Sequence, residues 1–261
     1  MSEIVLTETH GAVRVITLNR PETRNALNTA LHRESAAAFS EAEDDENVAV
    51  IVLTGTDPAF CAGLDLKELG EGGANLSGGH RGEQTDARWT NPIRAVWETS
   101  KPVIGAINGA CITGGFELAL GCDFLIASER AVFGDTHGRV GLTPGGGMSV
   151  FLPMAVGLRR AKELSYTGNF LAAEPALAAG LVNHVVPHNE LLSFTIGLAN
   201  EIASNDGPTV QHLKKLYDHN SRLEPGAALE HENKVFRDYR IDFAALEQRR
   251  QGVIERGRTQ Q

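Results

Sequence analysis

The sequence predicts an α/β fold with a helical C-terminal extension. Short β-branched and apolar runs alternate with helix-period segments through the first part of the 261-residue chain, whereas only helical patterns follow Pro187. Strands that alternate with helices imply crossover connections and mainly parallel pairing. We therefore expect an α/β body over residues 1–190 and a helical extension over residues 191–261.

The first elements are expected between residues 4 and 54. The runs Ile4–Thr9 and Ala12–Asn19, separated by His10-Gly11, indicate a β-hairpin. A helix-period stretch then opens at Asn25-Ala-Leu-Asn28 and reaches about Glu43. The unbroken apolar run Val48–Thr54 is typical of a strand that is covered on both faces.

Further elements follow in the same alternating order. They are a helix near Thr85–Thr99, a strand at Pro102–Asn108, a helix at Gly114–Gly121 and a strand at Asp123–Ser128. Between Leu69 and Glu83 six glycines fall within fifteen residues, which predicts a mobile surface loop. The extension carries four helical patterns, Leu191–Ala203, Pro208–His219, Pro225–Phe236 and Phe243–Arg256. They are too short to form a separate core, so we expect them to pack on the body or on a neighbouring subunit.

Composition excludes several functional classes. The 24 Lys and Arg residues against 33 Asp and Glu residues leave a net charge of −9, which argues against nucleic acid as a partner. Three cysteines, Cys61, Cys111 and Cys122, without C-x-x-C spacing indicate neither a disulfide framework nor a zinc site. The N-terminus has no basic segment before an apolar one, and no run of about 18 apolar residues occurs. We expect a cytoplasmic protein that neither enters a membrane nor holds a metal.

The stretch Ala59–Leu66 follows a predicted strand and precedes a helical pattern. Gly63 allows a tight turn, after which the Leu64 amide is a candidate hydrogen-bond donor to a ligand. The alternative is an ordinary strand-to-helix turn in which Asp65 caps the helix.

The stretch Gly109–Gly121 carries the strongest chemical signal. Gly114 opens a helix, so its N–H group points to where a developing negative charge can sit. The Leu64 and Gly114 amides together would make an oxyanion hole, in which each donor is worth roughly 3–4 kcal/mol in a transition state. Glu117 follows among apolar neighbours, where a carboxylate needs a catalytic task or a partner. The alternative is a helix glutamate in an ion pair.

The third stretch, Phe133–Gly147, places His137 in an expected loop. A loop histidine is either a surface residue or, given its near-neutral pKa, a proton-transfer group. The glycine spacing here matches neither common nucleotide-binding motif, which argues against nucleotide hydrolysis. Neither G-x-S-x-G nor H-E-x-x-H occurs in the sequence, so serine-nucleophile and metalloprotease chemistry lack support.

Taken together, these stretches resemble the enoyl-CoA hydratase/isomerase family, also called the crotonase superfamily. The resemblance runs through VRVITLNRPETRNALN, AFCAGLDLKEL, KPVIGAINGACITGGFELALGCD, FGDTHGRVGLTPGGG and AKELSYTGNFLAAEPALAAGLVNHVVP, most of the first 190 residues. It implies a crotonase-like spiral of repeated ββα units followed by a helical trimerisation region. It also implies assembly as a homotrimer or a dimer of trimers.

The resemblance implies a hydro-lyase that hydrates 2-enoyl-CoA thioesters. The family stabilises a thioester enolate between two amides, which here are those of Leu64 and Gly114, and its hydratases use two glutamates. The first is present as Glu117, whereas His137 occupies the second position. Retention of Glu117 favours a hydratase over an isomerase. The alternatives are another crotonase reaction that uses His137, namely isomerisation, hydrolysis or lyase cleavage, and a non-catalytic acyl-CoA-binding protein.

The resemblance also places the coenzyme A arm of the substrate. It points to Ala26, Ala62, Leu64 and Gly114 along the arm, and to Lys67 near the phosphates, although Lys67 also suits a solvated helix face. Coenzyme A enters as part of the substrate, and no separate cofactor is expected. The tail EQRRQGVIERGRTQQ aligns poorly with the family pattern, so no tail residue is assigned to coenzyme A.

Overall fold

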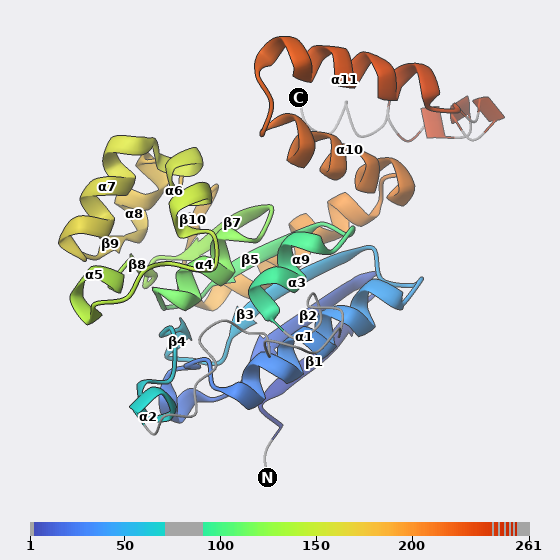
Figure 1. Ribbon diagram of the computed structural model, residues 1–261. Coiled ribbons are helices and arrows are strands. Elements are labelled where there is room, and N and C mark those ends of the chain that lie inside the picture. The colour runs from blue at the N-terminus through green and yellow to red at the C-terminus, as the bar shows by residue number, and fades with distance from the viewer. Residues whose placement is uncertain are drawn as a thin grey trace, which may run out of the picture. The chain divides into compact units, whose positions relative to one another are not determined.

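The computed structural model describes residues 3–70 and 91–241, with scattered residues between 243 and 254 (Figure 1). Most of the predicted glycine-rich loop, the first part of the helix expected near Thr85–Thr99 and several residues of the last predicted helix lie outside the described residues. The chain forms two compact units, Met1–His212 and Leu213–Gln261.

A six-stranded sheet forms the centre of the first unit. Its order is β1 (Val5–His10), β2 (Val13–Leu18), β3 (Val50–Gly55), β5 (Val103–Ile107), β7 (Phe124–Ser128) and β10 (His184–Val186). The strands β1 and β2 form the predicted antiparallel hairpin, and the remaining pairs are parallel. The prediction of a mainly parallel sheet is therefore confirmed.

A second, smaller sheet explains the repeated units of the fold. It contains β4 (Ala59–Cys61), β6 (Ala110–Ile112), β8 (Val132–Gly134) and β9 (Leu171–Ala172). The strands β3, β5 and β7 of the main sheet are each followed in the chain by a strand of the small sheet. This alternation between sheets produces the predicted spiral, and it places the ends of β4, β6 and β8 beside one another.

Helices begin where the sequence supplies a cap or a turn residue. The described α-helices that lie wholly in the first unit are α1 (Thr29–Asp44), α2 (Leu66–Gly70), α3 (Pro92–Glu98), α4 (Gly114–Leu120), α5 (His137–Val140), α6 (Met148–Val156), α7 (Leu158–Thr167), α8 (Ala173–Ala178) and α9 (Leu191–Ala203). The Asn28 side chain accepts a hydrogen bond from Leu31 N–H and so begins α1. Gly157 and Gly168, both at positive φ, bound α7.

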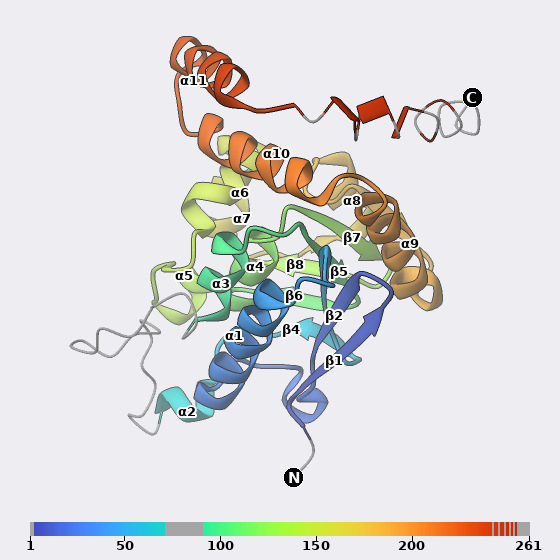
Figure 2. The ribbon, with the colours of Figure 1, turned by 90° about the vertical axis from the view of Figure 1, so that its right-hand side faces the viewer.

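The two faces of the main sheet bury separate hydrophobic clusters. Ile51 and Leu53 face the larger cluster together with α1, α3 and α4, whereas the alternate residues Val50 and Val52 face α9. Figures 1 and 2 show α1 and α9 on opposite sides of the strands.

The helix α9 follows the boundary predicted near residue 190 and packs on the body, which is one of the two arrangements expected for the extension. The helix α9 buries Leu191 and Ala199 against the main sheet, so it belongs to the first unit. The division between the compact units follows His212. The apolar face of α9 closes the core of the body, and the sequence pattern alone did not distinguish such a helix from one in a separate extension.

The second unit contains the C-terminal end of α10 (Gly207–Asn220) and all of α11 (Pro225–Asp238). The His231 Nδ1 atom lies 2.7 Å from Asn220 Oδ1, and the rings of His219 and His231 have centroids 4.1 Å apart and planes tilted by 41°. Within the part of the chain that the structure describes, no helix is long and apolar enough to cross a membrane.

Candidate active site

Two backbone amides converge where β4 and β6 lead into helices. Gly63 adopts φ +95°, and a Cβ atom at this position would lie 2.9 Å from Ile112 O. A Cβ atom at Gly114 would lie 3.7 Å from Leu64 N, so the two turns approach closely. Neither the Leu64 N–H nor the Gly114 N–H donates a hydrogen bond to any residue that the structure describes. The predicted pair of donors is thus brought together and left available.

The turn before α4 is held in a sparsely populated conformation. Thr113 has φ 50° and ψ −108°, which a β-branched residue adopts only when its surroundings impose it. Its N–H donates to Gly134 O at 2.8 Å, and its hydroxyl accepts from Thr136 N–H at 3.2 Å and contacts Thr136 Oγ1. These contacts fix the direction of the Gly114 amide.

The turn at Leu64 is held from the N-terminal part of the chain. Leu27 N–H donates to Gly63 O at 2.7 Å, and Asp65 N–H donates to Leu27 O at 3.0 Å. The Arg20 guanidinium binds Asp65 Oδ2 through both terminal nitrogens and donates to Ala26 O at 2.6 Å. The predicted capping role of Asp65 is also present, because its Oδ1 accepts from Lys67 N–H. Sequence reasoning missed Arg20.

Glu117 is 4% exposed, and each of its carboxylate oxygens has a different environment. Oε1 accepts a hydrogen bond from Gly146 N–H at 2.6 Å. A Cβ atom at Gly146 would lie 2.8 Å from the Glu117 carboxyl carbon, so only glycine permits this approach. Oε2 faces His137 Nε2 at 3.9 Å. Among the described residues, no Lys or Arg lies within ion-pair distance of Glu117.

His137 differs from the loop residue that the sequence predicted. It begins the short helix α5 and is buried, with only 6% of its surface exposed. Its Nδ1 lies 2.7 Å from Asp135 Oδ1, and its backbone N–H donates to the same oxygen at 3.1 Å. Burial lowers the pKa of His137, but the hydrogen bond and charge of Asp135 and the charge of Glu117 outweigh burial, so the pKa is raised.

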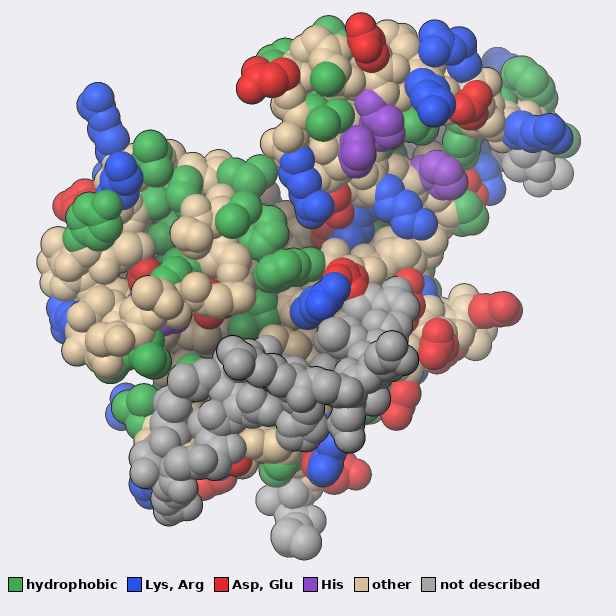
Figure 3. Space-filling model, viewed as in Figure 1, with side chains coloured by type: hydrophobic (Ala, Val, Ile, Leu, Met, Phe, Trp, Pro, Cys, Tyr) green, Lys and Arg blue, Asp and Glu red, His purple; other side chains and the backbone are tan. Residues whose placement is uncertain are grey.

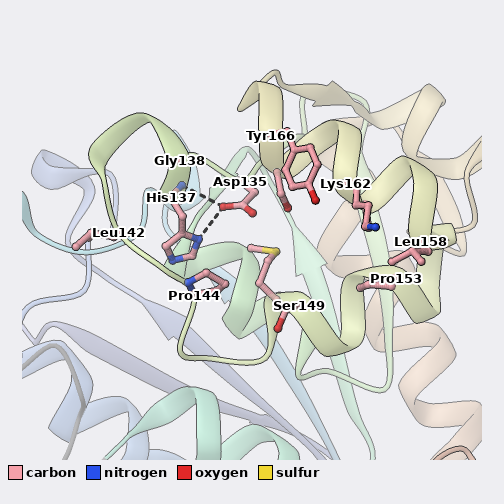
Figure 4. A pocket seen from close by; sticks show the side chains of 13 residues that line it. Asp135, His137, Gly138, Leu142, Pro144, Ser149, Pro153, Leu158, Lys162 and Tyr166 are labelled. Carbon is pink, nitrogen blue, oxygen red and sulfur yellow. Dashed lines mark hydrogen bonds and ion pairs between the residues drawn. The ribbon is translucent and has the colours of Figure 1, made fainter.

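A cavity of about 350 Å³ borders the Asp135–His137 pair (Figure 4). Its walls come mainly from α5, α6 and α7 and are largely apolar. The lining residues are Asp135, His137, Gly138, Leu142, Pro144, Met148, Ser149, Pro153, Leu158, Ala161, Lys162, Ser165 and Tyr166. One side of the Asp135–His137 pair therefore faces the cavity. Glu117 is not among the residues that line this cavity.

Of the residues assigned to the coenzyme arm, Gly114 begins α4 and the others lie on two adjacent segments. Ala62 N–H donates to Arg24 O at 3.0 Å, and this bond continues the ladder that joins Leu27 to Gly63. The ladder brings Ala26 alongside Ala62 and Leu64, whereas Lys67 is exposed on α2. These segments form one continuous edge that leads to the two amides.

This arrangement suits chemistry beside a carbonyl group. Two free amides can polarise a carbonyl oxygen, and a buried carboxylate and imidazole face each other nearby. Sequence reasoning identified Leu64, Gly114, Glu117 and His137 but missed Asp135 and Gly146. The D-x-H spacing was the available signal for Asp135. Among the described residues, no group of three His, Cys, Asp or Glu side chains is arranged to hold a metal ion.

Comparison with known proteins identifies similar chains. A family model for enoyl-CoA hydratase/isomerase matches residues 8–258. A probable peroxisomal enoyl-CoA hydratase 1 of Arabidopsis thaliana is 39% identical over 84% of this chain and 80% of its own length. A short-chain-enoyl-CoA hydratase of Clostridium acetobutylicum is 36% identical over 89% of this chain and 87% of its own length.

Solved structures agree with the sequence matches. The crystal structure of an enoyl-CoA hydratase from Mycobacterium smegmatis has a TM-score of 0.74 and 45% identity, and covers 91% of this chain and 98% of its own. That of an enoyl-CoA hydratase from Bacillus anthracis has a TM-score of 0.80 and 34% identity, with 90% of each chain covered.

Proposed function

Because the chain belongs to the enoyl-CoA hydratase/isomerase family, we propose that it is an enoyl-CoA hydratase. It adds water syn to 2-trans-enoyl-CoA and forms 3-hydroxyacyl-CoA. One observation carries the assignment: the buried Glu117 carboxylate faces His137 in the same fold unit that presents two free amides. The hydratase relatives of A. thaliana and C. acetobutylicum support the same reaction.

The Leu64 and Gly114 amides bind the thioester oxygen. When water adds to C3, the electron pair of the double bond moves toward this oxygen and forms an enolate. Donors that are already oriented stabilise this charge without reorganising, and each contributes roughly 3–4 kcal/mol to the transition state. The contacts of Thr113 and Asp65 hold the donors in place.

Glu117 acts as general base and then as general acid. Gly146 N–H holds Oε1, which leaves Oε2 to take a proton from water as the water oxygen bonds to C3. The protonated carboxyl group then returns a proton to C2. Because one carboxylate delivers both parts of the water molecule, both add to the same face of the double bond. His137 Nε2, on the Oε2 side of Glu117, positions the water.

The coenzyme A part of the substrate lies along Ala26, Ala62 and Leu64, with Lys67 toward its phosphates. The ladder between these segments and the exposed Lys67 support this placement. No separate cofactor takes part.

The chain assembles as a homotrimer or a dimer of trimers. Exposed apolar side chains support this assembly, because large apolar patches mark contact surfaces. In the first unit they gather over α6 and α7 (Figure 3) and extend to β9. They include Val150, Met154, Leu158, Tyr166 and Phe170, and the second unit adds Leu213, Tyr217, Leu229 and Phe236. Light scattering coupled to size-exclusion chromatography measures the oligomer, and a monomer would contradict the proposal.

The protein works in the cytoplasm, in the metabolism of fatty acids or related acyl-CoA compounds. The three free cysteines support a reducing compartment. The names of two relatives place those proteins in peroxisomes and mitochondria, so localisation in cells of the source organism tests this point.

The assay for hydration follows the loss of the conjugated enoyl thioester absorbance. Glu117→Gln should reduce the rate by at least about 100-fold, because it removes the general base. The matched control is Glu129→Gln, which changes an exposed glutamate and should retain the rate. Unchanged activity of Glu117→Gln would contradict the assignment.

The presence of His137 favours one alternative, a different crotonase reaction. Mass spectrometry of the products separates the reactions: hydration adds water, isomerisation leaves the mass unchanged and hydrolysis releases free coenzyme A. Tight acyl-CoA binding without turnover would indicate a binding protein. If His137→Ala abolishes hydration and Glu117→Gln does not, the roles of the two residues are reversed.

A further inference from the structure

Asp135 is the residue in closest polar contact with the imidazole of His137. It is 2% exposed, and its Oδ1 atom receives both the backbone N–H and the Nδ1 contact of His137 (Figure 4). The Ser165 side chain also hydrogen-bonds to Asp135. We infer that Asp135 is a positioning residue that directs His137 Nε2 toward Glu117, an inference that rests on the proposed hydration. Asp135 acts through His137 and does not itself touch the reacting atoms.

The contact with Asp135 determines which nitrogen of His137 carries a permanent proton. An ionised carboxylate only accepts hydrogen bonds, so Nδ1 must be the donor across the 2.7 Å contact. In the neutral imidazole Nε2 then holds the lone pair, and in the charged form it holds the exchangeable proton. Either way, the atom that gains or loses a proton is the one that lies 3.9 Å from Glu117 Oε2.

The other groups around His137 come from three elements. Glu117 reaches it from α4, while Lys162 and Tyr166 of α7 line the same cavity. From α6, the cavity receives only uncharged side chains, including Ser149. Of these groups, the negative charges of Asp135 and Glu117 favour the imidazolium. Asp135 lies closer to the His137 imidazole than Glu117 does. Removal of the Asp135 charge should therefore lower the pKa of His137 more than removal of the Glu117 charge.

The same unit contains a second Asp–His pair that provides a matched control. Asp57 Oδ2 lies 2.9 Å from His188 Nε2, and Ser128 Oγ contacts His188 Nδ1 at 2.9 Å. The Asp57 side chain is 59% exposed, and the polar contacts described for His188, with Asp57 and Ser128, involve neither Glu117 nor a residue of the cavity. This pair joins the turn before β4 to the short 3-10 helix His188–Glu190 and has no assigned part in the reaction. Asp57→Asn therefore makes the same chemical change outside the site.

The test measures the titration of the His137 imidazole and the rate of hydration. NMR follows the titration of the imidazole signals of the 9 histidines, and His137→Gln identifies the signal of interest by its loss. Asp135→Asn keeps an oxygen acceptor but removes the charge. We expect it to lower the pKa of His137, whereas Asp57→Asn leaves that pKa unchanged.

Kinetics then distinguish positioning from a purely structural role. In Asp135→Asn, kcat for hydration should fall at least about tenfold with little change in KM. The ionisation of His137 in the pH profile should move to lower pH by the same amount as in the NMR titration. An unchanged titration, or a loss of kcat that leaves the pH profile in place, would overturn the inference.

Two further measurements distinguish a failure of the inference from a folding defect and from a failure of the proposed function. If Asp135→Asn does not fold, Ser165→Ala removes one hydrogen bond to Asp135, which leaves its carboxylate a stronger acceptor for His137 Nδ1 and should raise the pKa of His137. An unchanged His137 titration in Ser165→Ala would then count against the inference. If the wild-type protein does not hydrate enoyl thioesters, the proposed function fails, and the NMR titration still decides whether Asp135 controls His137.

Discussion

The two turns that present the free amides are built in different ways. The turn at Leu64 uses a glycine, Gly63, at φ +95°, and an ion pair between Arg20 and Asp65 fastens it to the chain. The turn at Gly114 uses a β-branched residue, Thr113, at φ 50°, and the hydrogen bonds that described residues make with Thr113 are all uncharged. The backbone of the first turn is unstrained and an ion pair holds it in place. The backbone of the second turn is strained, and uncharged hydrogen bonds hold it in place.

The difference explains how two amides from distant parts of the chain can be held in one place. A glycine turn costs little to form but has many alternative conformations, so it needs an external tether. A strained threonine persists only because its surroundings impose one conformation. Both turns depend on close packing, since a Cβ atom at Gly115 would lie 2.2 Å from Cys61 O. Single substitutions can therefore disrupt the packing, the ion pair or the uncharged hydrogen bonds separately.

The largest effect is expected for Gly115→Ala, which blocks the packing that both turns share. The added Cβ would meet the Cys61 backbone, which cannot rotate away, so the start of α4 must separate from β4. We expect the free energy of unfolding to fall by about 3 kcal/mol or more, as in overpacked cores. Hydration should be lost because the amides separate. Urea denaturation and the enoyl thioester assay measure the two effects.

Gly114→Ala is the control for this prediction. A Cβ atom at Gly114 has its nearest contact at 3.6 Å, with the Leu27 side chain, and φ is not positive there. The change should alter the stability by less than about 1 kcal/mol. Equal stability of the Gly115→Ala and Gly114→Ala variants would show that close packing does not hold the turns.

The same contrast separates what the sequence predicted from what it did not. Gly63, Gly114 and Glu117 lie in local strand-to-helix patterns, so the sequence pointed to them. Arg20 and Gly146 were missed because their partners lie 45 and 29 residues away, and only the fold brings them together. His137 was expected in a loop because the burial of a polar residue depends on distant elements, here α7 and Glu117 of α4.

The fold was predicted in a similarly uneven way. The sequence predicted the strands β2, β3 and β5 and the helix α9. Each of these elements is long enough to show the pattern of apolar residues that is typical of a strand or of a helix. The strands of the small sheet have two or three residues, too few for a period to appear. The sequence left open whether α9 packs on the body or on a neighbouring subunit, because its partner, the main sheet, is formed by residues far from it in the sequence.

An intermediate effect is expected for Asp65→Asn, which removes the negative charge of the Arg20–Asp65 ion pair that holds the first turn. Both side chains of the Arg20–Asp65 pair are 13% exposed, and the change should lower the stability by about 1–2 kcal/mol at neutral pH. Burial raises the pKa of Asp65, but the Arg20 hydrogen bonds and charge and the neighbouring amides outweigh it and lower the pKa below 3.8.

This pKa shift determines how the effect depends on pH. A carboxyl group whose folded pKa is depressed stabilises the protein above its unfolded pKa of 3.8, and this contribution is lost as the pH falls through the folded value. The difference between wild type and Asp65→Asn should therefore be constant near neutral pH and shrink below about pH 4. Glu34→Gln removes the charge of an exposed ion pair with Arg33 and should have little effect. A difference that grows in acid would contradict the charged tether.

The smallest effect is expected for Thr113→Val, which removes the neutral tether of the second turn. Valine keeps the branched shape but loses the hydroxyl that accepts from Thr136 N–H and contacts Thr136 Oγ1. The stability should fall by about 1 kcal/mol, and Thr113→Ser, which keeps the hydroxyl, should remain close to wild type. Because no charge is involved, urea denaturation should give the same loss at pH 3.5 and pH 7. A loss that follows pH in parallel with Asp65→Asn would mean that charge holds both turns, and the contrast between them would disappear.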